Sequence, residues 1–239
     1  SEDEIIKKII EDLRRVLKEV EEIHKEVEER LDKVLKEAEE MHKEVLKELD
    51  RVLDEVKRIE DVETVLRLAI EAVRRALEIV RKVTEDLIRV VRKLLEIVDR
   101  VNKRVKKAVE DVLKLLRDTL KGSKDVERVL DEARRLLEKL HRDSRRILKR
   151  IKELLDELKE LSERILERIK RLLEEVERRN SDDERLLEEL IEELKDLIRR
   201  HIELLRRLIE RLKELLKKHI EDLRRLLEEI EKLLEEARK

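Results

Sequence analysis

The sequence predicts an all-α protein, an elongated antiparallel four-helix bundle with nearly straight helices. Charged residues make up 54% of the 239 positions and hydrophobic residues 40%, with one Gly and no Pro, a composition typical of long helices. Apolar residues recur every three or four positions, which predicts one buried stripe per helix. The stretch EEIHKEV around His24 returns as EEMHKEV around His42, 18 positions later. Five turns of a straight helix take 18 residues, so this repeat favours helices with little supercoiling.

The first two helices are predicted over residues 2–59 and 61–121. Neither Gly nor Pro separates them, and the turn is placed near Glu60 because DVETVL at 61–66 resembles DVERVL at 125–130, which follows Gly122. Asp is a good N-cap residue, so Asp61 is expected to begin the second helix. The alternative is one helix of about 120 residues beside two shorter ones, which would leave half of its apolar stripe without a partner.

The last two helices are predicted over residues 125–179 and 182–238. Gly122 offers a C-terminal glycine before Ser123, and Asn180 offers the same role before Ser181 and Asp182. Short joints make successive helices antiparallel neighbours. Residues 1–239 are therefore expected to form a single four-helix-bundle domain.

Eight polar residues interrupt the apolar stripes, two in each predicted helix and always 18 positions apart. Alignment of antiparallel helices by their midpoints sorts them into two layers with one residue from each helix. We name them the Thr layer, which contains His42, Thr84, Ser162 and His201, and the Asn layer, which contains His24, Asn102, Ser144 and His219. His141 has Lys159 as its counterpart 18 positions later, so it is expected at the surface.

Each layer is interpreted as a buried hydrogen-bond network that fixes helix register. Imidazole, hydroxyl and amide groups can donate to and accept from one another, and a group left unpaired would cost about 1–3 kcal/mol. A zinc site would need three or four ligands, and the stripes offer no Cys, Asp or Glu at these levels. A haem site would need small residues around the histidines, and a serine nucleophile would need an orienting acid and an oxyanion hole. We therefore expect no catalytic, cofactor-binding or metal site.

Composition also narrows the classes of partner. A net charge of −2 and the absence of aromatic residues argue against nucleic-acid binding. No apolar run approaches the ~18 residues that cross a bilayer, so no membrane partner is expected, and the polar, acidic N-terminus does not resemble a signal peptide. We expect a soluble chain with no small-molecule substrate and no cofactor.

The chain resembles de novo designed helical bundles with buried hydrogen-bond networks. The resemblance rests on the Leu/Val/Ile stripes, the Glu/Lys/Arg surface, the 18-residue repeat, the short joints KGSKD and RNSDDE, and the polar layers. It implies a recombinant, cytoplasmically produced scaffold or assembly module that is not an enzyme and has no natural substrate.

Two alternatives stay open beside the scaffold. One is an interaction protein made of two complementary helical hairpins that dimerise or swap. The other is a pH-responsive bundle that acts through its buried histidines. A monomer is expected, with a homodimer or a designed helical partner as the alternative states.

Overall fold

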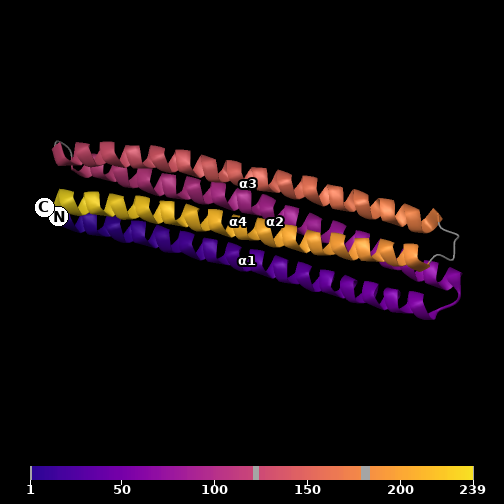
Figure 1. Ribbon diagram of the computed structural model, residues 1–239. Helices are drawn as coiled ribbons and strands as arrows, with labels where there is room; N and C mark the ends of the chain where they lie inside the picture. The colour runs from indigo at the N-terminus through magenta and orange to yellow at the C-terminus, as the bar shows by residue number, and fades with distance from the viewer. Residues whose placement is uncertain (1, 121–123, 179–183, 239) are drawn as a thin grey trace. The chain divides into compact units, whose positions relative to one another are not determined.

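The computed structural model describes residues 2–120, 124–178 and 184–238, and within them the chain forms four helices and no strand. The helices are α1 (Glu2–Arg58), α2 (Val62–Thr119), α3 (Lys124–Arg178) and α4 (Glu184–Arg238), labelled in Figure 1. The prediction of an all-α four-helix bundle is confirmed. The limits expected at residues 2, 59, 61, 125 and 238 lie within one residue of the observed ones, and those expected at residues 121, 179 and 182 lie outside the described residues. That the helices are nearly straight and the bundle elongated stays a prediction.

The break between α1 and α2 lies at residues 59–61, although no Gly or Pro marks it. Asp61 caps α2: one carboxylate oxygen accepts from the backbone N–H of Glu63 at 3.2 Å, and the other accepts from the Thr64 hydroxyl at 2.7 Å. The bond from Glu63 satisfies a backbone donor that the first turn of a helix leaves free. The expected joints at Gly122 and at Asn180 to Asp182 lie outside the described residues.

The chain divides into two compact units. The first unit contains Ser1–Glu29, Arg92–Glu153 and Leu212–Lys239, and the second contains Arg30–Val91 and Leu154–Arg211. Every helix contributes one segment to each unit. The single domain expected over residues 1–239 stays a prediction.

Ion pairs show the helix arrangement inside each unit. In the first unit Arg14 pairs with Glu231, and Arg224 pairs with Glu21 at 3.2 Å, so α4 runs antiparallel to α1. Further pairs place α2 beside α1 and α3 beside α4, namely Arg104–Glu19 and Arg128–Glu236. In the second unit the same neighbours are joined by Arg206–Glu39, Arg75–Glu48 and Arg168–Glu193, and α2 contacts α3 through Arg74–Glu177.

Each unit has an aliphatic core built from all four helices. Fully buried members include Val105 and Leu223 in the first unit, and Leu49 and Ile169 in the second. Burial of such a side chain stabilises the fold by about 1.5–3 kcal/mol. Because Leu and Ile repeat along every stripe, and Val along the stripes of α1 and α2, these contacts discriminate poorly between one helix register and another.

Candidate functional site

The Thr layer lies in the core of the second unit, where no side chain of the layer is more than 6% exposed. His42 comes from α1, Thr84 from α2, Ser162 from α3 and His201 from α4. Each occupies an apolar stripe, so helical periodicity alone turns it toward the core. The structure therefore places these four predicted residues at buried positions of one unit.

The two histidines of the Thr layer form a hydrogen-bonded pair. His42 Nδ1 lies 2.7 Å from the Ala38 carbonyl oxygen, and His42 Nε2 lies 2.7 Å from His201 Nδ1. A carbonyl oxygen only accepts, so the Nδ1 of His42 carries a proton. When both rings are neutral, His42 Nε2 must therefore accept from the Nδ1–H of His201. The rings also stack, with centroids 4.9 Å apart.

Thr84 continues this path from α4 to α2. Its Oγ1 lies 3.1 Å from His201 Nε2 and 2.7 Å from the Val80 carbonyl oxygen. The hydroxyl has one proton, which it can donate either to the imidazole or to the carbonyl. The hydrogen-bonded path thus connects α1, α4 and α2.

Ser162 differs from the expectation, because its buried Oγ makes no hydrogen bond. Its counterpart Ser144 bonds the side-chain oxygen of Asn102 at 3.1 Å. Thr84 stands where the Asn layer has Asn102, and a threonine side chain is one atom shorter than an asparagine. The shorter side chain gives Ser162 no acceptor, so α3 stays outside the Thr-layer path.

The Asn layer repeats the imidazole pair in the first unit. His24 Nδ1 lies 3.1 Å from the Val20 carbonyl oxygen, and His24 Nε2 lies 2.8 Å from His219 Nδ1. His219 Nε2 in turn lies 2.6 Å from Asn102 Oδ1, which also accepts from the Ser144 hydroxyl. This path connects all four helices, and Asn102 is its one half-buried member.

Burial lowers the pKa of all four core histidines, because an apolar surrounding disfavours the charged ring. Burial first, and then the neighbouring imidazole, lower the pKa of His201 and His219 to about 3. At neutral pH the layers therefore contain uncharged rings, which the apolar core tolerates when they are hydrogen-bonded.

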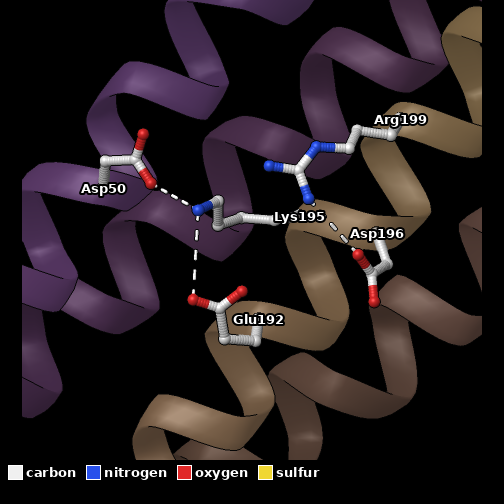
Figure 2. A network of polar contacts seen from close by, with 5 residues as sticks. All are labelled: Asp50, Glu192, Lys195, Asp196 and Arg199. Atoms are coloured by element: carbon white, nitrogen blue, oxygen red, sulfur yellow. Dashed lines mark hydrogen bonds and ion pairs between the residues drawn. The ribbon is translucent and has the colours of Figure 1, made fainter.

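A buried lysine on α4 escaped the sequence analysis. Lys195 is 8% exposed, and its ammonium group lies 2.5 Å from a carboxylate oxygen of Asp50 on α1 and 3.9 Å from one of Glu192 (Figure 2). Its aliphatic stem is buried while the charge reaches an exposed carboxylate. The signal that could have found it is its place three residues before the core residue Ile198.

His141 is exposed on α3, where the sequence predicted a surface position. Among the residues that the structure describes, no group of three or more His, Asp, Glu or Cys side chains could hold a metal ion. In those same ranges no helix is long and apolar enough to cross a membrane. All four ring nitrogens of each pair lie within hydrogen-bond distance of the other ring or of a protein oxygen. The arrangement can therefore hold and exchange protons and fix helix positions.

Comparison with known proteins adds little beyond this geometry. No protein-family model and no curated protein matches the chain. A solved structure described as a computationally designed three helix bundle aligns with a TM-score of 0.40 and 17% sequence identity, over 95% of this chain and 93% of that one. At that level of similarity the match says nothing about function.

Proposed function

We propose that this chain is a structural scaffold of the designed-bundle type, without catalytic activity or natural substrate. Two buried hydrogen-bond layers specify how its aliphatic helices pair. The observation that supports the proposal is the imidazole pair, which occurs in both units at the same relative positions on α1 and α4.

The layers act by raising the free energy of every other alignment of the helices. A shift of α1 along α4 by one turn would separate His42 from His201 and bury ring nitrogens without partners. Each unpaired buried group costs about 1–3 kcal/mol. The aliphatic contacts would change little, because one Leu or Val would replace another.

The test compares the chain with a variant in which all eight layer residues are Leu or Val. Both carry spin labels at Lys43→Cys and Glu203→Cys, two exposed positions of the second unit in a chain without other cysteines. We expect one narrow distance distribution for the parent layers, and a broad or split distribution for the aliphatic variant despite equal or higher stability. Equally narrow distributions would show that the layers do not select the register.

The proposed scaffold is a monomer. Light scattering at rising protein concentration should give a constant mass of one chain. A dimer whose fraction grows with concentration would favour the alternative in which helical hairpins exchange between chains.

A second candidate function, a pH-responsive bundle, is favoured by the burial of four imidazoles whose layer partners carry no charge. Such rings resist protonation in the folded state, while the unfolded chain accepts protons freely. Chemical denaturation at pH 7.5 and pH 4.5 tests this function, and an unchanged midpoint would refute it.

A further inference from the structure

We propose that each imidazole pair is a binding site for one proton, shared between its two rings while the protein stays folded, and that the pair excludes a second proton. The proposal deepens the pH-responsive candidate and rests on it. It follows from a count of the protons that the hydrogen-bonded paths can hold.

In the Asn layer the three hydrogen-bond contacts of the path hold more protons than two neutral rings supply. The path runs from the Val20 carbonyl oxygen through His24 and His219 to Asn102 Oδ1, with three contacts of 3.1, 2.8 and 2.6 Å. Both ends are oxygens that only accept, so each contact needs a proton from a ring nitrogen. Two neutral imidazoles carry two such protons. The observed geometry therefore accommodates a third.

The contacts of the Thr layer also hold one proton more than its neutral groups supply. Its path has four contacts, from Ala38 O through His42 and His201 to Thr84 Oγ1 and then Val80 O. Two neutral rings and one hydroxyl supply three protons. One additional proton on His201 Nε2 would complete the fourth bond, with Thr84 accepting from the ring and donating to the carbonyl.

The neutral layers also satisfy their hydrogen bonds, so the proton can leave without loss of the pairing. Rotation of the Asn102 amide presents its NH2 group to His219 Nε2, and rotation of the Thr84 hydroxyl presents its proton to His201 Nε2. The carbonyl of Val80 keeps its backbone donor from the helix. Each layer thus has two charge states with intact imidazole pairing.

A second proton has no place in either layer. It would set an N–H against another N–H across a gap of 2.7 or 2.8 Å and bring two cations together in the core. The effect of the neighbouring ring on the pKa of His201 and of His219 agrees with this exclusion. A doubly charged pair would have to separate, which opens the contact between α1 and α4.

Charged groups near the Thr layer are few. Glu39 of α1 and Arg206 of α4 pair with each other at 2.8 Å outside the imidazoles. From α2 and α3 the layer receives only the uncharged Thr84 and Ser162, and the nearby carboxylates of Glu85 and Glu163 are exposed.

The Asn layer has more charge around it. Glu21 of α1 pairs with Arg224 of α4, and Lys103 pairs with Asp99 on α2 at 3.1 Å. Asp222 of α4 approaches Asp143 of α3, and burial, then this neighbour, raise the pKa of Asp222. Cations that act on Asp222 are Lys139, Lys218 and Arg225.

Two differences favour proton uptake by the Asn layer before the Thr layer. Asp143 and Asp222 stand where the repeat places Leu161 and Leu204 in the second unit. A groove of about 850 Å³ between α2 and α3 also reaches Asn102 and Ser144, so water approaches this layer. Nearby carboxylates and partial hydration both favour the cation.

The test is an acid titration of the full chain with 15N-labelled histidine, followed by ring-nitrogen NMR while circular dichroism monitors folding. Exposed His141 provides an internal reference for one full proton. We expect each pair to take up one proton in the folded state, the Asn layer at higher pH, with the charge distributed over both rings. Two protons per pair, or unfolding before any uptake, would overturn the proposal.

Two isosteric variants test the role of the terminal partners. Asn102→Asp fixes an acceptor at His219, so the midpoint of that pair should rise by about 1 pH unit or more. Thr84→Val removes the acceptor at His201, so the midpoint of that pair should fall. Each variant should leave the pair in the other unit unchanged, and equal shifts of both pairs would contradict the assignment.

The titration also distinguishes failure of the one-proton proposal from failure of the pH-responsive function. A folded chain that takes up four protons, with acid destabilisation retained, would contradict the one-proton count and leave the pH-responsive function standing. No uptake together with unchanged stability in acid would contradict both.

Discussion

At the residue scale, the tautomers of the core histidines are set on α1. There the Nδ1 of each histidine faces the carbonyl oxygen of the residue four positions earlier. Val20 O and Ala38 O can only accept, so His24 and His42 carry their proton on Nδ1. Each then offers Nε2 to its partner on α4, which in the neutral pair must also be protonated on Nδ1. A single backbone contact thus orients two rings, as outer hydrogen bonds commonly do for functional histidines.

The two core serines provide the first prediction, because they share a helix and a repeat position yet differ in bonding. Ser144→Ala removes a hydrogen bond to Asn102 and should destabilise the fold by about 1 kcal/mol. Ser162→Ala removes a buried hydroxyl without a partner and should be neutral or stabilising. Guanidinium denaturation measures the difference, which we expect to be about 1–2 kcal/mol.

A double-mutant cycle provides the control for this prediction. In a Thr84→Asn background the longer side chain can reach Ser162, so Ser162→Ala should become as costly as Ser144→Ala. Equal stability of the Ser144→Ala and Ser162→Ala variants in the parent chain would contradict the assignment of a hydrogen bond to Ser144 and none to Ser162.

At the element scale, the start of α2 depends on one side chain. Asp61→Ala removes both hydrogen bonds that cap the helix, and should cost about 1 kcal/mol, with faster amide exchange at Glu63. Asp61→Asn keeps a cap of similar strength and should retain most of the stability. Equal losses in the two variants would indicate an effect of charge on the helix dipole instead of capping.

Much of this fold follows from the sequence, because long helices with regular stripes leave few alternatives. The break at residues 59–61 could be predicted from the repeat of the DVE motif, although no helix breaker occurs there. The bonding of the layers could not be predicted in full. The eight polar positions were predicted from the 18-residue period and sorted into layers by alignment of the helix midpoints. The orphan hydroxyl of Ser162 depends on the reach of Thr84, which helical periodicity does not describe.

Lys195 shows a second limit of periodicity. A stripe pattern assigns each position to the core or the surface, while a lysine can bury its stem and still place its charge beside Asp50. Such a position needs side-chain geometry for its assignment.

At the scale of the whole molecule, stability should fall in mild acid. The folded pKa values of the four core histidines lie below the unfolded value of 6.5. Their contribution is therefore complete above pH 6.5, declines as pH falls below it, and stops declining at the folded values, about 3 for His201 and His219. At pH 4.5 each ring that stays neutral in the folded protein lowers the free energy of unfolding by about 3 kcal/mol, relative to its value well above pH 6.5.

The control for the acid response is the variant His42→Asn with His201→Asn, which removes the titration of one pair. Carboxylates contribute equally to both proteins, so the variant should lose about half as much histidine-dependent stability between pH 7.5 and pH 4.5. The same loss in both proteins would assign the acid response to carboxylates.

Both proposals depend on two imidazole pairs that bridge α1 and α4 in the folded protein. The most direct measurement is the 15N–15N coupling across an N–H···N hydrogen bond, recorded at pH 7.5 on chain labelled at histidine. The structure predicts two such couplings, one from His24 Nε2 to His219 Nδ1 and one from His42 Nε2 to His201 Nδ1, with all four rings protonated on Nδ1. Absence of either coupling, or rings protonated on Nε2, would contradict the account.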